Sequence, residues 1–428
     1  MQSNLFKNYN ELATTPNRQL ALEIIESGLD AINTESVIKN KIKLENNILL
    51  IEDKSFDLSK FKRIKVVGFG KSSCEAAMAM EKILGSGITD GAVVGLEKVD
   101  CKYIEIFAGT HPRPSEANFE AGKKIYEIIK DSTEEDLIIV LASGGGSALL
   151  CYPESEYTEG VKLYDAFLKF GGTISQMNTI RKHLSLLKGG GLAKIAYPAT
   201  VVGLIFSDVP GDAFENVASG PTYKDDTTVA LAQKFIAENN LGDFSLIETP
   251  KEDKYFEKVH NFVLVSNNTA VEAMAKKAQD LDFSVDILST ELYDEVGVAL
   301  RKIFSVDSFS KRENYVVLAA GEPRVTVLKN AGKGGRNLHM ALEAVRMELV
   351  NDNSVFISFA SDGADNSDSA GAIVDKNTME KVKKLNLDVD DYSSRFDSYN
   401  FFQKTGDIIF TDPTGANVSD LMILLTKK

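Results

Sequence analysis

The stretch Leu137–Leu150 reads LIIVLASGGGSALL, and it predicts the fold more strongly than any other part of the chain. Six apolar residues in a row are typical of a strand buried on both faces, because a half-exposed strand would alternate apolar with polar residues. Three glycines follow directly. Glycine has no Cβ, so several backbone N–H groups of such a turn can face one ligand. The stretch therefore predicts a central strand with a ligand-binding turn at its carboxyl end.

The same alternation of strands and helices continues on both sides of this stretch. Ile64–Gly68, Ala92–Gly95 and Leu204–Phe206 are predicted strands, and Glu116–Lys130 is a predicted helix between two of them. Continuous apolar runs separated by helices indicate a parallel sheet covered on both faces. Ligands of such sheets bind at the carboxyl ends of the strands. We therefore predict an α/β fold with a Rossmann-like N-terminal domain and a mostly parallel sheet.

A polar stretch at 238–258 is the best candidate for a domain boundary. Beyond it, Phe262–Val265, the helix Thr269–Asp280 and the strand Ser284–Leu288 form a new βαβ pattern. Further strands are expected at Tyr315–Ala319, Val325–Leu328, Val355–Phe359 and Leu421–Leu424. We predict two α/β domains, residues 1–250 and 251–428, the second smaller and partly antiparallel.

Composition excludes several classes of protein. The formal net charge of −14 argues against a nucleic-acid or anionic-membrane partner. Three separated cysteines without a CxxC pair argue against a structural zinc site and fit a reducing compartment. The segment Met1–Gln19 is polar and lacks the apolar core of a signal peptide, and no apolar run is long enough to cross a bilayer. We expect a soluble, cytoplasmic protein.

The first candidate site is the turn after the predicted strand at 64–68. Gly70-Lys71-Ser72 matches the end of a P-loop, but Lys65 occupies the position of its first glycine. Ser73 likewise occupies the third glycine position of GxGxxG. A tight turn, a helix N-terminus and Lys71 remain, and together they suit an anion. The alternative is a tight turn with an exposed lysine.

The second candidate site is the glycine turn of the opening stretch. A helix is expected to follow it and to add the positive end of its dipole to any phosphate bound there. A nucleophile elbow is the rival reading, but its second glycine is replaced by Leu149. The predicted phosphate-binding residues of this turn are Ser143, Gly144, Gly145, Gly146 and Ser147.

The third candidate site lies in Met177–Thr222, where cations, glycines and aspartates follow one another. Its polar residues Asn178, Arg181, Lys182, Ser185 and Lys188 recur at spacings of three or four, so one helix would place most of them on one face. The triple glycine 189–191 would end that helix. A solvated cationic face is the alternative interpretation.

Two aspartates follow the next predicted strand. Asp208 and Asp212 stand in the turn after Leu204–Phe206. Mg²⁺ prefers one or two carboxylates together with phosphate oxygens, so this turn is a candidate metal site. Aspartate is also common in turns for backbone reasons alone.

The second half of the chain carries further glycine-rich segments. Gly321-Glu322 and Gly332–Asn337 would let the backbone approach a ligand, and Arg336 offers a planar fork for a carboxylate or phosphate. Ser361–Asp365 and Asp412–Asn417 form two more polar turns. In the first half, His111 stands in a proline-rich loop, either as a catalytic group or as a positioned hydrogen-bonding residue.

Eight of these motifs occur in the order of one family. They read GFGKSS, GTHPRPSE, LASGGGSALL, NTIRKHLSLLKGGGLAK, FSDVPGDAFENVASGPT, GKGGRN, SDGADNSDSAGA and DPTGANVSD. From about Arg18 to Asp420 the chain resembles the class II glycerate kinases, whose C-terminal half is called the MOFRL domain. The resemblance implies ATP- and Mg²⁺-dependent phosphorylation of D-glycerate at the 2-hydroxyl, with a site in the cleft between a Rossmann-like domain and a smaller MOFRL-type domain.

The resemblance also implies roles for individual residues. The active-site residues of the family correspond to Lys71, Asp208, Arg336 and Asp362. Together with the reasoning above, we expect phosphate binding by Gly68, Gly70, Ser143, Gly144, Gly145, Gly146, Ser147 and Lys188. Expected substrate-binding residues are Asn178, Arg181, Glu322 and Asn337, and expected metal ligands are Asp208 and Asp212.

Three alternatives stay open. Where the family has an amide and a carboxylate after its GGRN motif, this chain has Leu338 and His339, which favours a kinase of a related sugar acid such as a tetronate. A hydroxypyruvate reductase would need a dinucleotide fingerprint, which Ser73 breaks. A non-catalytic binding protein is disfavoured by the four retained active-site residues. The expected partners are small molecules, and the sequence is compatible with a homodimer without determining one.

Overall fold

The chain forms two compact units in the computed structural model, which describes residues 5–170, 173–209, 213–305, 314–327 and 331–427. The first unit contains residues 34–265, and the second contains residues 1–33 together with 266–428. The structure therefore differs from the predicted division at 250/251 in two ways. The N-terminal segment Met1–Asn33 belongs to the C-terminal unit, and the later crossing lies at 265/266.

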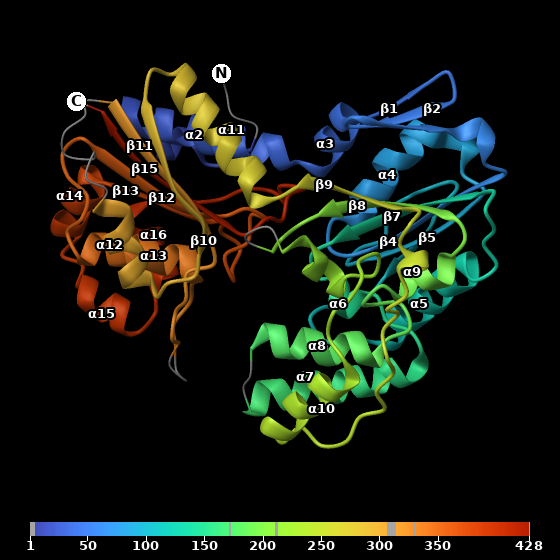
Figure 1. The fold of residues 1–428 in the computed structure, drawn as a ribbon. Coiled ribbons are helices and arrows are strands. Elements are labelled where there is room, and N and C mark those ends of the chain that lie inside the picture. The colour runs from blue at the N-terminus through green and yellow to red at the C-terminus, as the bar shows by residue number, and fades with distance from the viewer. Residues whose placement is uncertain (1–4, 171–172, 210–212, 306–313, 328–330, 428) are drawn as a thin grey trace. The chain divides into compact units, whose positions relative to one another are not determined.

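A six-stranded, fully parallel sheet is the centre of the first unit (Figure 1). Its strands are β4 (Arg63–Phe69), β5 (Asp90–Gly95), β6 (Glu105–Ala108), β7 (Asp136–Ser143), β8 (Thr200–Phe206) and β9 (Val259–Val265). The spatial order β6-β5-β4-β7-β8-β9 is the third, second, first, fourth, fifth and sixth strand in chain order, as in Rossmann folds. The Rossmann-like prediction is confirmed.

Helices cover this sheet and bury its apolar residues. All eight residues of β7 are buried, in keeping with the continuous apolar run of the sequence. The helices of the first unit are α3 (Thr34–Lys41), α4 (Ser73–Leu84), α5 (Glu116–Ile129), α6 (Gly146–Leu149), α7 (Glu154–Phe170), α8 (Ile174–Leu184), α9 (Gly191–Ala196) and α10 (Val229–Glu238). Short 3-10 helices lie at η1 (Leu58–Lys60), η2 (Gly85–Gly87), η3 (Phe214–Ser219) and η4 (Asp253–Tyr255).

Strand β9 corrects the predicted organisation. The apolar run Phe262–Val265 was expected to open the second domain, yet β9 pairs in parallel with β8 and completes the first sheet. Because β9 forms its hydrogen bonds with β8 of the first sheet, the polar stretch before β9 is a long connection within the first unit. A small antiparallel sheet of β1 (Ile42–Glu45), β2 (Ile48–Ile51) and β3 (Lys54–Asp57) was not predicted.

A six-stranded mixed sheet is the centre of the second unit, in the order β10-β11-β15-β12-β13-β14. Its strands are β10 (Ser284–Leu292), β11 (Asn314–Gly321), β12 (Ser354–Ala360), β13 (Gly371–Asp375), β14 (Ile408–Ile409) and β15 (Asp420–Lys427). Only β10 and β11 run parallel, and the other pairs are antiparallel, which confirms the partly antiparallel prediction. The expected strand at 325–328 is wrong for residues 325–327, which are irregular, and Leu328 lies outside the described residues.

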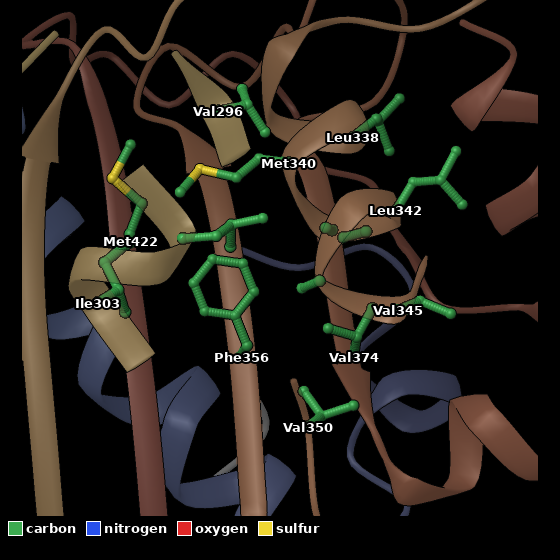
Figure 2. Close-up of a cluster of buried hydrophobic side chains, with 14 of the residues drawn as sticks. Val296, Ile303, Leu338, Met340, Leu342, Val345, Val350, Phe356, Val374 and Met422 are labelled. Carbon is green, nitrogen blue, oxygen red and sulfur yellow. The ribbon is translucent and has the colours of Figure 1, made fainter. Parts of the chain in front are cut away.

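Helix α13 supplies much of the apolar core of the second unit (Figure 2). Its residues Leu338, Met340, Leu342 and Val345 are at most 1% exposed and belong to one cluster of buried side chains that also includes Phe356 of β12. Burying a side chain of this size stabilises a fold by about 1.5–3 kcal/mol. The helices of this unit are α1 (Tyr9–Leu12), α2 (Pro16–Ile32), α11 (Asn267–Asp280), α12 (Val296–Phe304), α13 (Arg336–Arg346), α14 (Lys376–Leu385), α15 (Val389–Ser394) and α16 (Ser398–Thr405).

A buried ion cluster explains why the N-terminal segment joins the second unit. Arg18 of α2 is fully buried, and its guanidinium lies 2.7 Å from Asp375 and 2.9 Å from Asp407. Breaking such a cluster is costly, because a buried charge without its partner cannot return to water. None of the described helices combines the length and apolar character that a membrane span requires.

Candidate functional site

The order of strands in the first sheet locates a candidate site. The order reverses between β4 and β7, and in open α/β sheets ligands bind outside the carboxyl ends of the strands at this point. Both glycine turns found in the sequence lie there, Gly70–Ser72 after β4 and Gly144–Ser147 after β7. The register pairs Phe69 with Ala142, so the two turns leave the sheet at the same level.

The two turns are bonded to each other. The Lys71 N–H donates to the Gly144 carbonyl at 2.8 Å, and the Ser72 N–H donates to the Ser143 hydroxyl at 3.1 Å. Gly70 has φ +130°, and a Cβ placed on it would lie 2.2 Å from Ser143 Oγ. Gly68 is buried inside β4 against Leu141. Of the predicted phosphate-binding residues, Gly68, Gly70 and Ser143 therefore pack the two turns together.

The glycines after β7 make room for functional side chains. A Cβ placed on Gly144 would lie 1.9 Å from Asp208 Oδ2, so only glycine allows this carboxylate to reach the turn. Asp208 follows β8, and β8 ends opposite Ser143 in the register of the sheet. At Gly145 the neighbours are Lys71 and His111, whose Cγ and Cδ2 atoms lie 3.1 and 3.2 Å from the corresponding Cβ position. The turn thus collects an aspartate, a lysine and a histidine.

Two further basic groups influence His111. Partial burial of the ring, followed by the charges of Lys71 and Arg181, lowers the pKa of His111 to about 4. Burial also lowers the pKa of Arg181, which is half-buried in α8. The side chains of Lys71, His111 and Arg181 make no hydrogen bond or ion pair with any residue that the structure describes. Two unpaired cations beside a neutral imidazole favour an anionic ligand.

Helix α8 presents the basic residues that the sequence singled out. It begins with a capping box, in which Thr173 Oγ1 accepts from Gln176 N at 3.2 Å and Gln176 Oε1 accepts from Thr173 N at 3.0 Å. Arg181 lines a small cavity together with Ser147 and Pro114. The helix thereby brings Arg181 to the glycine turn.

The expected helix up to the triple glycine is wrong beyond Leu184. Helix α8 ends at Leu184, Ser185 is extended, and a separate helix, α9, begins at Gly191. Lys188 lies outside both helices and is 2% exposed. Its ammonium donates to the Leu150 carbonyl at 2.6 Å and pairs with the Glu156 carboxylate. The charge of Lys188 is therefore used inside the unit, in contrast to its predicted role at phosphate.

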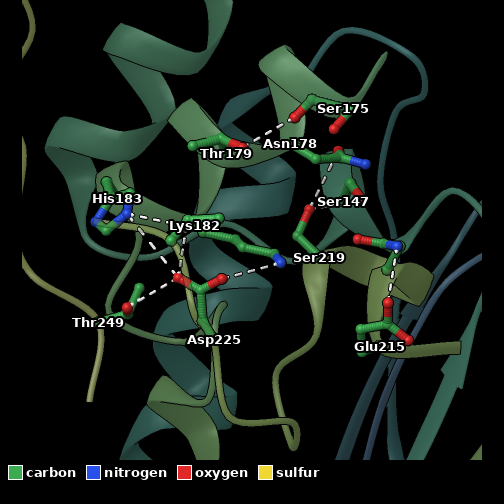
Figure 3. A network of polar contacts seen from close by, with 12 residues as sticks. Ser147, Ser175, Asn178, Thr179, Lys182, His183, Glu215, Ser219, Asp225 and Thr249 are labelled. Carbon is green, nitrogen blue, oxygen red and sulfur yellow. Dashed lines mark hydrogen bonds and ion pairs between the residues drawn. The ribbon is translucent and has the colours of Figure 1, made fainter. Parts of the chain in front are cut away.

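A buried carboxylate fixes the other side of α8 (Figure 3). Asp225 is 3% exposed and accepts from Lys182 Nζ at 3.1 Å, from Thr227 at 2.7 Å and from Thr249 at 2.9 Å. His183, fully buried, contacts the Ile247 carbonyl at 2.9 Å. This network ties α8 to the segments at 225–227 and 247–249. Lys182 and His183 are thus anchoring residues.

A hydroxyl chain joins α8 to the glycine turn (Figure 3). The Ser219 hydroxyl lies 2.9 Å from Ser147 Oγ and 3.5 Å from Asn178 Oδ1. Ala218 and Ser219 have φ of +52° and +61°, the left-handed region that residues with a Cβ seldom occupy. Adjacent strained residues of this kind cluster at binding sites, where the surroundings hold them in place. The Ser219 hydroxyl thus links Ser147 of the glycine turn to Asn178 of α8.

The donor set can be tested against a magnesium ion. Asp208 brings one carboxylate to a turn with backbone amides and hydroxyls, while Asp212 lies outside the described residues. Among the residues that the structure describes, no group of three or more His, Cys, Asp or Glu side chains gathers as a metal site. One carboxylate fits Mg²⁺ when phosphate oxygens complete its shell, because this ion rarely uses an all-protein cage.

The second unit holds its basic site residue between two carboxylates. Arg336, the first residue of α13, lies 3.1 Å from Glu322 and pairs with Asp420. Asp420 is the first residue of β15 and stands opposite Gly321 of β11 and Ala360 of β12. Burial raises the pKa of Asp420 to about 7, in spite of the neighbouring guanidinium. Burial lowers the pKa of Arg336, but Asp420 and Glu322 together outweigh it and raise the pKa overall, so the guanidinium stays charged.

Two other predicted site residues belong to the second unit. Asn337 follows Arg336 in α13, and Asp362 lies in the turn after β12. Asn337 is 1% exposed, with its amide bonded to Asp365 at 3.2 Å and its carbonyl accepting from Ser358 at 2.6 Å. The structure thus places its side chain inside the unit rather than at an open surface. Asp362 is half-buried in the turn after β12 and accepts from the Ala364 N–H at 3.0 Å.

Sequence reasoning missed two residues of these arrangements, Asp420 and Asp225, and the contact of a third, His111. Asp420 stood at the end of a quoted motif, but only the antiparallel pairing of β15 shows that it faces Arg336. No sequence pattern marked Asp225, because an aspartate next to threonines is typical of an ordinary loop. His111 was noticed in its proline-rich loop, and its contact with Gly145 depends on the folded loop.

Comparisons with known proteins find relatives along most of this chain. Residues 20–249 match the family described as "Domain of unknown function (DUF4147)", and residues 315–420 match the MOFRL family. A glycerate 2-kinase of Pyrococcus horikoshii is 35% identical, with 95% of this chain and 97% of that protein covered. A putative hydroxypyruvate reductase of Agrobacterium vitis is 34% identical, with 85% and 87% covered. The crystal structure of the Thermotoga maritima glycerate kinase superposes with a TM-score of 0.84 at 31% identity, covering 95% of this chain and 99% of that one.

Proposed function

This chain belongs to the glycerate 2-kinase family, and we propose from this premise that it transfers a phosphoryl group from ATP to the 2-hydroxyl of D-glycerate. The observation that supports the proposal most is the turn after β7, where Asp208 and Lys71 both reach one run of glycines. Phosphoryl transfer depends mainly on positioning the reactants and neutralising the charge of the transferred oxygens. A turn that combines backbone amides, a cation and a carboxylate offers these functions.

We assign the phosphate chain of ATP to Gly144, Gly145, Gly146 and Ser147. Lys71 would neutralise the charge of the transferred group. Asp208 would hold Mg²⁺, which supplies further charge neutralisation when it is bound. Arg181 and Asn178, both on α8, would orient the acid substrate.

Residues of the second unit enter the same proposal through the family resemblance. Arg336 would bind a carboxylate or phosphate through the part of its guanidinium that Asp420 and Glu322 leave accessible, since its side chain is 37% exposed. Asp362 would orient the attacking hydroxyl, and a carboxylate there acts by geometry as much as by basicity. The position of the site between two domains stays a prediction of the resemblance.

The structure gives less support than the sequence does to a related sugar acid as the substrate. Leu338 is fully buried and belongs to the apolar cluster of the second unit. His339 stacks on Phe396 with ring centroids 4.8 Å apart. These two departures from the family pattern therefore have contacts within the unit, and the observations favour D-glycerate.

A reductase would need a bound dinucleotide. Ser73, at the third glycine position of the fingerprint, is fully buried and donates to the Leu141 carbonyl at 3.1 Å. It ties α4 to β7, which is a packing role. The turn after β4 therefore lacks the glycine that brings a helix close to a pyrophosphate.

One assay tests these functions together. The purified protein receives D-glycerate, ATP and Mg²⁺, and product formation is read through enolase, which accepts only the 2-phosphate. We expect enolase-competent product and ADP in equal amounts. NADH consumption with hydroxypyruvate in place of ADP formation would overturn the proposal, and activity on a tetronate alone would change the substrate.

A further inference from the structure

Three basic side chains meet at the glycine turn without a partner among the described residues. Lys71 comes from the turn after β4, and His111 comes from the loop at 110–114. Lys71 Cγ and His111 Cδ2 lie 3.1 and 3.2 Å from the position of a Cβ placed on Gly145. Arg181 lines the neighbouring cavity with Ser147 and Pro114, and its charge acts on His111. Each belongs to a different segment of the chain. A fold that places two unpaired cations beside a neutral imidazole accepts repulsion between the cations, which an anion from outside the protein would relieve.

Three other charged groups lie near His111. Arg113 and Glu156 have partners within the unit, and Asp208 lies beside the glycine turn. Arg113, on the same loop as His111, forms an ion pair with Asp165 at 2.7 Å. Glu156, which lines the cavity, is used by Lys188. Asp208 lies against Gly144, one residue from the position that His111 and Lys71 flank. The charges that act on the His111 ring are those of Lys71 and Arg181, and both are positive.

We propose that His111 is the third binding residue of an oxyanion site formed with Lys71 and Arg181, and that it takes up a proton when the oxyanion binds. The inference rests on the proposed function, because the oxyanion is either the transferred phosphoryl group or the carboxylate of the acid substrate. In the free protein, burial of the ring and then the charges of the two cations disfavour a positive charge on His111. A bound oxyanion reverses this balance, and the protonated ring then donates a charge-assisted hydrogen bond.

The coupling has a definite direction. Because the pKa of His111 in the free protein is about 4, the ring is neutral at pH 7. An anion that raises the proton affinity of the ring must itself bind more tightly when the ring is protonated, by the same factor. Between the pKa values of the free and the occupied site, affinity for the oxyanion should rise about tenfold for each unit by which the pH falls.

Calorimetry can measure this proton directly. Sulfate and D-glycerate are titrated separately into the native protein between pH 7.5 and pH 5.5, in pairs of buffers with different ionisation enthalpies. Neither probe changes its own charge in this range, so any proton taken up belongs to the protein. We expect uptake that approaches one proton per bound ion, together with an affinity at least tenfold higher at the lower pH.

A matched pair of variants assigns the proton. His111→Gln keeps a polar side chain without the charge, so its affinity should not change with pH and the uptake should vanish. His260→Gln is the control, since this histidine also stands beside a lysine, with Lys54 Nζ 2.7 Å from its Nδ1, but it lies on β9 away from the turn. The control should behave like the native protein. Thermal unfolding of both variants verifies the fold.

The outcomes separate the sources of the oxyanion. Uptake with sulfate identifies the position of the phosphoryl group, and uptake with D-glycerate alone identifies the carboxylate position. Unchanged uptake in His111→Gln, or none in the native protein with either probe, would overturn the inference. Kinase activity is measured in parallel, so that a protein without kinase activity but with uptake dependent on His111 would contradict only the proposed function.

Discussion

The two units hold their basic site residues in opposite ways. In the first unit, Lys71 and Arg181 have no partner among the described residues. In the second, Arg336 lies between Asp420 and Glu322. An unpaired cation leaves its full charge for a ligand and adds repulsion to the ligand-free fold. A paired cation gives up part of its charge and gains a fixed orientation, since its planar fork is held from two sides.

This difference leads to a general expectation. Substitutions in the unpaired group should lower activity without lowering stability, because the free protein gains nothing from these charges. Substitutions of paired, buried charges should lower stability, because they leave a partner unsatisfied. The following substitutions test the contrast, from the largest expected effect to the smallest.

Replacement of the lysine at the glycine turn should have the largest effect. Lys71→Ala removes a charge directed at the transferred group, and we expect turnover to fall by about 10²–10³-fold. The midpoint of thermal unfolding should stay the same or rise. Lys82→Ala is the control, because this exposed lysine forms a surface ion pair with Glu35. Near-normal turnover of Lys71→Ala in the enolase-coupled assay would remove the residue from the reaction.

The first unit also contains a paired charge, at Asp225. Asp225→Asn leaves Lys182 buried beside a neutral amide, so we expect a loss of about 3 kcal/mol in the free energy of unfolding. Urea denaturation measures this loss. Asp253→Asn, in an exposed pair with Lys224, should change stability by less than about 1 kcal/mol. Equal effects of the two substitutions would show that the buried network does not anchor α8.

The second unit should give stability a specific dependence on pH. The unfolded chain loses the proton of an aspartate near pH 4, whereas native Asp420 holds it to about pH 7. The native state therefore binds more protons in this window, and stability falls as the pH rises through it, by up to about 1.4 kcal/mol per unit.

Asp420→Asn should remove that contribution, so the stabilities of variant and native protein should diverge with pH between 4 and 7. Urea unfolding at several pH values within this window measures the difference. Asp352→Asn, in an exposed pair with Lys376, is the control and should run parallel to the native protein. A parallel course for Asp420→Asn as well would contradict a raised pKa at this carboxyl group.

The smallest expected effect has the opposite sign. Arg181→Met removes one of the unpaired cations while keeping much of the apolar side chain, so stability should rise by about 0.5–1 kcal/mol. Arg113→Met, which removes an exposed ion pair with Asp165, should be neutral or slightly destabilising. Thermal unfolding compares the two variants. Destabilisation by Arg181→Met would indicate that this cation has a structural partner.

Much of the first unit was predictable from short-range patterns. The apolar runs at β4, β5, β7 and β8 are long enough to indicate buried strands, and each was found within a few residues of its predicted bounds. The glycine turns follow the strands directly, so their place at the carboxyl edge follows from the parallel sheet. Asp208 reaches this edge for the same reason.

Predictions failed where a residue's partner is distant in the chain. Lys188 has the spacing of a helical cationic face, yet its chain leaves the helix at Leu184 and its ammonium finds Glu156. β9 follows a polar linker and looks like the start of a domain, yet it pairs with β8. Arg18 gave no sign that α2 belongs with the segment 266–428, because its partners Asp375 and Asp407 are far away in the sequence.

The sequence by itself determined the parallel α/β architecture, the glycine turns and the family, because hydrophobic period, glycine runs and motif order are local properties of the chain. Only the tertiary structure decided which charges are paired. Whether a lysine or arginine remains available to a ligand depends on which carboxylates the fold brings within a few ångströms. The stretch LIIVLASGGGSALL thus specifies a strand and a turn, while the folded chain alone places Asp208, Lys71 and His111 around it.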